Sequence, residues 1–243
     1  MLSVTHLTKR FGDFTALNRV SFEVREGEIL GLIGPNGSGK TTAFNCIAGA
    51  LAPSGGSVRF NGEEIGGRTP DAICHRGLAR TFQIPRPFRK LSILENVAVA
   101  AHFGATTRLG ESAARARARE ILALVGLPAT DDASTTALGA GGLKKLELAR
   151  ALATAPKLLL ADESLGGLDS SEMAGAAELL RRIRGELGVT IVWVEHIMAT
   201  LMRVVDRVVV LDHGEKIAEG KPREVAEDPR VIEAYLGEKV VLA

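Results

Sequence analysis

The sequence has only two cysteines and no long apolar run, and both features restrict the kinds of protein that it can encode. Cys46 and Cys74 are far apart and lack the paired spacing of a metal site, so we expect two reduced thiols in a cytosolic protein. The longest stretch without a charged residue, 41–58, contains Pro53 and several glycines and is not expected to cross a membrane. The first eleven residues mix polar and apolar types, which is not the pattern of a signal peptide.

The chain also lacks an excess of either charge. Its net charge is +1, with 30 basic and 29 acidic residues interspersed. Without a basic stripe to neutralise a phosphate backbone, nucleic acid is not an expected partner. The 243 residues, with a hydrophobic content of 46%, are enough for one large α/β domain or two small ones.

The order of the apolar segments predicts an α/β fold. Residues 2–7, 20–24 and 58–60 have β-forming side chains between turn residues and suggest antiparallel strands near the N-terminus. Short apolar runs at 29–33, 157–161, 189–194 and 207–211 are typical of buried parallel strands. The stretch 93–153 is rich in Ala, Arg, Glu and Leu at helical spacing, which predicts a helical subdomain inserted into the α/β core.

The most informative segment is a glycine-rich loop between a strand and a helix. Residues 34–42 read GPNGSGKTT, between the apolar run 29–33 and a helix expected over 42–51. In this context the motif indicates phosphate binding, because the glycines let backbone amides approach a phosphate chain and the helix N-terminus adds partial positive charge. Lys40 would reach the β- and γ-phosphates and the Thr41 hydroxyl would hold Mg²⁺. The candidate binding residues are Gly34, Pro35, Asn36, Gly37, Ser38, Gly39, Lys40, Thr41 and Thr42.

A second candidate element is an apolar strand that ends in two carboxylates. Residues 158–161 are followed by Asp162 and Glu163. A buried strand that carries Asp162 at its C-terminal end would place the carboxylate beside the phosphate loop, where it could bind Mg²⁺ through water. Glu163, on the opposite face of the strand, could orient an attacking water. An apolar run followed by two acidic residues can also be only the end of a strand. The presence of the phosphate-binding loop in the same chain is what supports a role in metal binding and catalysis.

Together these motifs resemble the ATP-binding subunits of ABC transporters, and the resemblance covers nearly the whole chain. Gln83 stands where that family has its Q-loop, Asp169 looks like the D-loop residue, and His196 looks like the switch histidine. Phe11 has the position of the aromatic residue that stacks on adenine. The resemblance implies a P-loop NTPase core that binds ATP and Mg²⁺, with Gln83, Glu163 and His196 as catalytic residues and Gln83 also near the metal. It also implies a single domain over 1–243, with an α/β core at about 1–85 and 154–243 and a helical subdomain at about 86–153.

Within the family, five tracts are similar to one subfamily, which supplies an ATPase subunit of branched-chain amino-acid importers and related systems. These tracts are 44–49, 79–83, 146–152, 194–198 and 231–238. The ATPase of lipopolysaccharide export is a close competitor because its tail is similar, although 44–46 and 81–83 favour the importer. A soluble ABC-type ATPase without a transport role is a third reading.

One motif departs from the family pattern. Where relatives usually have Leu-Ser-Gly-Gly-Gln, this chain has Leu138, Gly139, Ala140, Gly141 and Gly142. In the family this signature segment closes over the γ-phosphate held by the other subunit, with the Ser hydroxyl as one of its donors. Here the backbone amides remain and the hydroxyl is missing, so weaker closure is expected rather than none, unless the change is neutral variation.

The resemblance further implies partners and a location. A second ATPase subunit, more plausibly a different chain than a second copy, would complete the dimer, and integral membrane permeases would bind to it. The segment 84–88 beside Gln83 would receive a helix from a permease, although its exposed aromatic and prolines could also be ordinary packing. The protein would then be peripheral, on the cytoplasmic face of the inner or plasma membrane.

Overall fold

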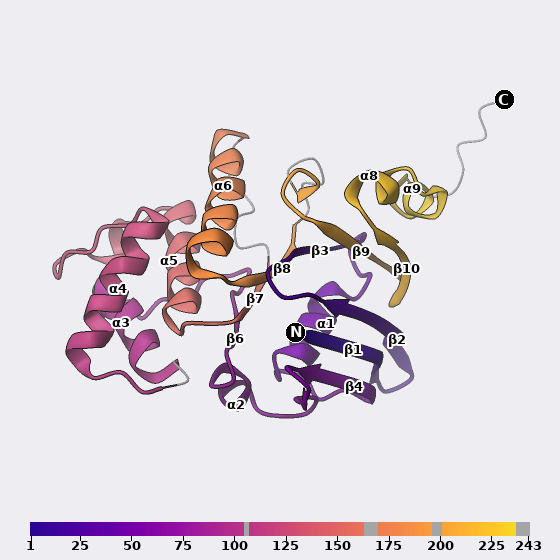
Figure 1. Ribbon diagram of the computed structural model, residues 1–243, viewed down its shortest axis with the longest axis horizontal. Coiled ribbons are helices and arrows are strands. Elements are labelled where there is room, and N and C mark those ends of the chain that lie inside the picture. The colour runs from indigo at the N-terminus through magenta and orange to yellow at the C-terminus, as the bar shows by residue number, and fades with distance from the viewer. Residues whose placement is uncertain (105–106, 163–169, 196–200, 237–243) are drawn as a thin grey trace. The chain divides into compact units, whose positions relative to one another are not determined.

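The computed structural model describes residues 1–104, 107–162, 170–195 and 201–236 (Figure 1). Its contacts divide the chain into two compact units. Unit 1 comprises Met1–Arg68 with Val192–Ala243, and unit 2 comprises Thr69–Ile191. The boundaries expected from the sequence, near 85 and 153, remain a prediction.

Unit 1 contains an antiparallel sheet in the order β2-β1-β4-β5. Buried and more exposed side chains alternate along parts of these strands, for example at Leu2, Ser3 and Val4, so one face of the sheet supplies apolar packing. The antiparallel region predicted near the N-terminus is confirmed. The strands are β1 (Leu2–Phe11), β2 (Phe14–Val24), β4 (Gly55–Phe60) and β5 (Glu63–Glu64).

Unit 1 also holds the strands that flank the glycine-rich loop. Strand β3 (Ile29–Ile33) is buried at every residue and pairs in parallel with β9 (Arg207–Asp212), which pairs antiparallel with β10 (Glu215–Gly220). Helix α1 (Lys40–Ile47) is shorter than the expected 42–51, because the chain turns at Gly49 with a φ of 78°. Two short helices, α8 (Pro222–Ala226) and α9 (Pro229–Leu236), follow β10.

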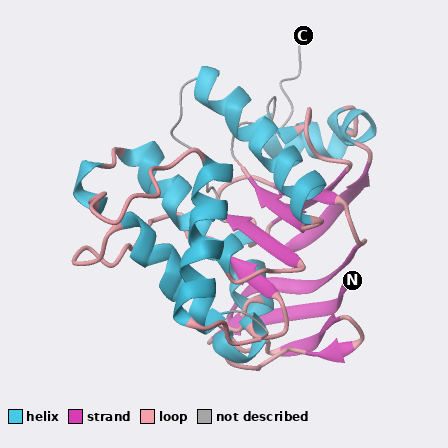
Figure 2. Cartoon of the chain, turned by 60° about the vertical axis from the view of Figure 1, so that its left-hand side comes forward, coloured by secondary structure: helices cyan, strands magenta, loops and turns pink. Residues whose placement is uncertain are grey.

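Unit 2 is mainly helical. Helices α3 (Ile93–Gly104), α4 (Glu111–Val125) and α5 (Ala140–Ala153) pack against one another, and they are visible as neighbouring coils in both ribbon views (Figures 1 and 2). This confirms the helical region predicted over 93–153. Strands β6 (Leu78–Arg80) and β7 (Leu158–Asp162) pair in parallel. The remaining elements are α2 (Pro70–Cys74), the 3₁₀ turn η1 (Thr135–Ala137), α6 (Ser170–Leu187) and β8 (Thr190–Val194), which begins in unit 2 and ends in unit 1.

The predicted α/β class is therefore confirmed. In the described part of the chain, no helix has both the length and the apolar character that crossing a bilayer requires.

Candidate functional site

The glycine-rich loop joins β3 to α1 in a turn that only glycine can make at two positions. Gly34 has a φ of 150°, and a Cβ built on it would lie 2.0 Å from the carbonyl oxygen of Leu211. Gly39 has a φ of 102°, and its Cβ would lie 2.9 Å from the carbonyl oxygen of Ala16. Any larger residue at either position would push the loop away from the backbone behind it.

Lys40 closes this loop from the inside. Its side chain is buried, and Nζ donates hydrogen bonds to the carbonyl oxygens of Gly34 at 2.8 Å and Pro35 at 2.9 Å. Ser38 Oγ lies 3.4 Å from the same ammonium. The positive charge is thus held inside the curve of the loop by contacts with the loop's own backbone.

The chemistry of this loop fits a phosphate group. Gly39 is the N-cap of α1 and supplies no side-chain cap, and the first turn of α1 has no acidic residue. A helix start without these compensating groups keeps its partial positive charge for an external anion. Together with the Lys40 ammonium, it offers the donor set that polyphosphates require.

The β9–β10 hairpin supports the loop, a contact that the sequence did not reveal. The N–H of Gly214 donates to the carbonyl oxygen of Ser38 at 3.1 Å, and its own carbonyl accepts from the N–H of Asn18 at 2.8 Å. A Cβ on Gly214 would lie 2.7 Å from the Ala16 carbonyl oxygen. The turn therefore ties the loop to β2.

The C-terminal helix also reaches the loop, through the hydroxyl of Tyr235. Burial raises the pKa of this hydroxyl above its ordinary value, while a hydrogen bond with the backbone of Gly34 acts in the opposite direction. In the sequence this tail is distinguished only by its resemblance to one subfamily, and no local pattern indicates the contact.

Phe11 ends β1 in unit 1, with its side chain 47% exposed. Lys9 Nζ lies 5.0 Å from the centre of the ring and also donates to the carbonyl oxygen of Ala52 at 2.8 Å. A ring held on one side and still partly exposed is suitable for stacking on a flat ligand.

In unit 2, Asp162 ends β7 and is buried beside the end of β6. Its carboxylate Oδ2 lies 2.8 Å from Nη2 of Arg80, and both side chains are at most 7% exposed. The N–H of Asp162 donates to Thr81 Oγ1 at 3.0 Å. The predicted metal ligand is thus fixed from two sides, and neither Arg80 nor Thr81 had been assigned a role from the sequence.

Gln83 lies in the exposed segment that follows β6, on the surface of unit 2. The continuation of this segment is anchored by the fully buried Asn96, whose Oδ1 accepts from the N–H of Phe88 at 2.8 Å. Arg150 of α5 donates to the carbonyl oxygen of Arg86 at 2.9 Å. These bonds fix the backbone at Arg86 and Phe88. The apolar side chains of Phe82, Ile84 and Phe88 in this segment are exposed.

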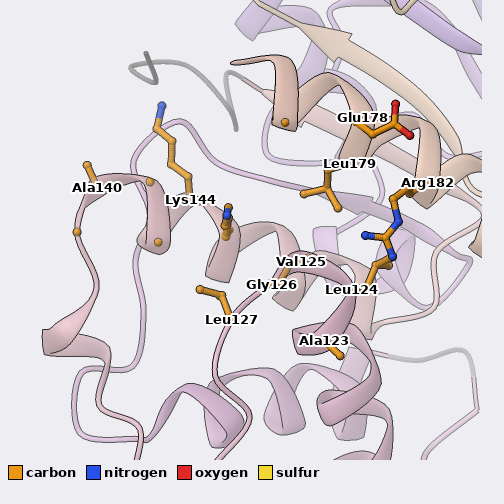
Figure 3. Close-up of a pocket in the computed structure, with 15 residues that line it drawn as sticks. Ala123, Leu124, Val125, Gly126, Leu127, Ala140, Lys144, Glu178, Leu179 and Arg182 are labelled. Atoms are coloured by element: carbon orange, nitrogen blue, oxygen red, sulfur yellow. The ribbon is translucent and has the colours of Figure 1, made fainter. Parts of the chain in front are cut away.

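The altered signature segment forms the start of α5. Gly139 is the N-cap of this helix, with φ −71° and ψ −178°, and it is exposed without a side-chain cap. It lines a cavity of about 690 Å³ in unit 2, shown in Figure 3 with Ala140 and Lys144 on one wall and Leu179 and Arg182 on another. The segment is therefore accessible from outside the unit.

Three predicted site residues, Glu163, Asp169 and His196, lie outside the described residues. Those that are described fall into two sets, one in each unit. Unit 1 carries Phe11 and the loop 34–42, and unit 2 carries Gln83, Asp162 and the signature segment.

Comparisons with known proteins agree with the resemblance seen in the sequence. Residues 17–166 match the family described as "ABC transporter", and residues 215–241 match "Branched-chain amino acid ATP-binding cassette transporter". The chain is 38% identical to the high-affinity branched-chain amino acid transport ATP-binding protein BraF of Pseudomonas aeruginosa, with 98% of each chain covered. It is 37% identical to the corresponding protein LivG of Escherichia coli K12, again over 98% of each.

The fold is also similar to the folds of solved structures. The crystal structure of the ADP conformation of MJ1267, an ATP-binding cassette of an ABC transporter, superposes with a TM-score of 0.88 at 31% identity. It covers 98% of this chain and 99% of that one. A nucleotide-free cassette from an ABC transporter superposes with a TM-score of 0.85 at 30% identity. The chain therefore belongs to the ABC transporter family, as one of its ATP-hydrolysing, ATP-binding cassettes.

Proposed function

We propose that this protein is the ATPase subunit that powers an importer of branched-chain amino acids or related small solutes. The observation that carries the proposal is the glycine-rich loop closed around the buried Lys40 ammonium, in a chain similar over its whole length to BraF and LivG. The match of residues 215–241 to the branched-chain subfamily supports the importer over lipopolysaccharide export. That export system and a soluble ATPase remain the alternatives.

Within this proposal the loop binds the phosphates of ATP. Its backbone amides donate hydrogen bonds to the phosphates, Lys40 compensates the charge of the β- and γ-phosphates, and Phe11 stacks on the adenine. The remaining loop contacts come from Gly34, Pro35, Asn36, Gly37, Ser38, Gly39, Thr41 and Thr42.

Mg²⁺ is the expected metal, since the candidate ligands Thr41, Gln83 and Asp162 all offer oxygen atoms, which this hard cation prefers. When bound, it supplies charge neutralisation on the phosphates. Asp162 would hold it through water. Glu163 orients the attacking water and accepts its proton, and His196 contacts the γ-phosphate.

The dimer and its membrane partners follow from the family. The signature segment 138–142 closes over ATP held by a second ATPase subunit, which is a different chain in the arrangement that we favour, and Asp169 contacts that subunit. The exposed apolar segment 84–88 meets a permease. In this proposal the protein is peripheral, on the cytoplasmic face of the inner or plasma membrane.

The test combines binding, turnover and co-purification. Lys40→Ala removes a charged partner of two phosphates, so ATP affinity falls about a hundredfold or more. Lys157→Ala, at an exposed lysine just before β7, leaves the affinity unchanged. Glu163→Gln binds ATP but stops at hydrolysis, because its amide cannot accept the proton from water.

Co-expression with neighbouring permease genes separates the classes. Stable co-purification with permeases and ATP-dependent uptake of leucine into vesicles support the importer. Turnover that is independent of any membrane subunit would instead support the soluble reading, and wild-type turnover of Glu163→Gln would contradict the catalytic assignment.

A further inference from the structure

The ion pair between Arg80 and Asp162 is almost completely withdrawn from solvent. Their exposed side-chain fractions are 7% and 4%, and the contact is 2.8 Å. A buried carboxylate is costly unless a positive group and hydrogen bonds compensate its charge. At this strand end, the guanidinium provides that compensation inside the protein itself.

The strand register explains why the two side chains meet. Arg80 is the register partner of Leu160 in the parallel β6–β7 pair, and the next N–H, of Thr81, donates to the carbonyl oxygen of Leu160 at 3.0 Å. The N–H of Asp162 then donates back to Thr81 Oγ1 at 3.0 Å. The two strand ends are bonded in both directions, so the backbone that carries the carboxylate is held in place, and the carboxylate itself is oriented by Arg80.

Arg80 has a second contact. Its Cζ lies 5.2 Å from the centre of the Phe82 ring, which is exposed and precedes Gln83 in the chain. The guanidinium is therefore close both to the carboxylate of Asp162 and to the segment that carries Gln83. Both of these are metal candidates in the proposed function.

We propose that Arg80 is a positioning residue that holds the Asp162 carboxylate in place and sets its affinity for Mg²⁺. The inference rests on the proposed function in one respect, the assignment of Asp162 to the metal. A fixed positive charge beside the carboxylate orients it and also repels an arriving cation. Removing the charge then has two opposite effects: the metal-free protein becomes less stable, and Mg²⁺ binds more tightly.

The experiment measures thermal unfolding of the full chain with saturating ADP while Mg²⁺ is titrated. Arg80→Gln is expected to unfold at a lower temperature than wild type without Mg²⁺, and to reach half of its Mg²⁺-dependent stabilisation at a roughly tenfold lower concentration. Arg80→Lys keeps the charge and is expected to stay within about threefold of the wild-type concentration. If Arg80→Lys binds Mg²⁺ more tightly than wild type by the same factor as Arg80→Gln, the charge of residue 80 does not set the Mg²⁺ affinity and the proposal is wrong.

A matched control is available in unit 1. Arg207 and Glu28 form another ion pair at 2.8 Å with little exposed side chain. Arg207→Gln is expected to lower the unfolding temperature by the same amount at every Mg²⁺ concentration. The same behaviour in Arg80→Gln would reduce Arg80 to a structural residue and refute the proposal.

One further readout and one further variant keep the outcome decisive. If Arg80→Gln does not fold alone, refolding with Mg²⁺ and ADP is the readout, because the metal would replace the missing charge; failure of that rescue counts against the proposal. Asp162→Asn separates this inference from the proposed function. If Asp162→Asn responds to Mg²⁺ as wild type does, Asp162 is not a metal ligand, and the inference about Arg80 fails with that assignment. Measurements on Arg80→Gln alone would not reveal this failure.

Discussion

Gly139→Ser restores the hydroxyl that the signature segment lacks, and the geometry of the position permits it. The backbone at Gly139 has φ −71° and ψ −178°, a conformation open to any residue. A Cβ at this position has nothing within 4 Å. The substitution therefore adds a side chain without strain, in a conformation that an N-cap serine adopts in many helices.

Its effect on the free energy of unfolding is small. Serine as the N-cap of α5 gains a few tenths of a kcal/mol over glycine, and the stiffer unfolded chain adds about 0.4–1 kcal/mol. For a chain of this size, a gain of about 1 kcal/mol raises the melting temperature by about 2–4 °C.

Its effect on nucleotide binding is larger. A serine hydroxyl can accept a bond from the helix N–H and at the same time donate its own proton to a phosphate oxygen. One hydrogen bond to a charged group contributes about 1.5–3 kcal/mol, so the site completed by this segment should gain about ten- to a hundredfold in ATP affinity. The site built on this chain's own loop meets the partner's signature and should not change.

The assay is ATP occupancy of the assembled transporter at equilibrium, with hydrolysis blocked by Glu163→Gln and by the matching change in the partner. Gly110→Ser is the control, because Gly110 is the N-cap of α4, with φ −65° and ψ 162° and also with nothing within 4 Å of its Cβ. It should reproduce the gain in stability without the gain in occupancy. If the two serine variants fill with ATP at the same concentrations, the missing hydroxyl is neutral variation and contributes nothing to ATP binding.

The other predictions concern the phosphate loop and the two thiols. Phe11→Ala should weaken ATP and ADP alike by about fivefold, from a stacking contact of about 1 kcal/mol; a lower melting temperature with unchanged affinity would instead assign Phe11 to packing. Tyr235→Phe removes the hydroxyl that interacts with the backbone of Gly34 and should weaken ADP binding by about two- to tenfold, whereas calorimetry that finds equal affinity would dismiss the contact. Burial raises the pKa of the Cys46 and Cys74 thiols, so both stay protonated at pH 7. A thiol reagent should then label the part-exposed Cys74 slowly and Cys46 only on unfolding, and rapid labelling of Cys46 in the native protein would contradict its burial.

The sequence alone determined those features in which the chemistry is local. The loop 34–42 is a run of adjacent residues whose glycines and lysine are constrained by the turn that they form, so the motif could be read directly. Buried strands such as β3 were also predictable, because residues buried on both faces leave an uninterrupted apolar run. The helices of unit 2 followed from the spacing of their apolar residues.

Tertiary structure decided the contacts between residues that are distant in the chain. Arg80 and Asp162 are 82 positions apart, and their pairing depends on the parallel register of β6 and β7, which no local pattern encodes. Gly214 and Tyr235 support the loop only because β9 and β10 return the chain to it. Ordinary turn and helix residues thus acquired a role at the site, since a hydrogen bond depends on where the folded backbone brings its donor and acceptor, and spacing along the sequence does not fix that position.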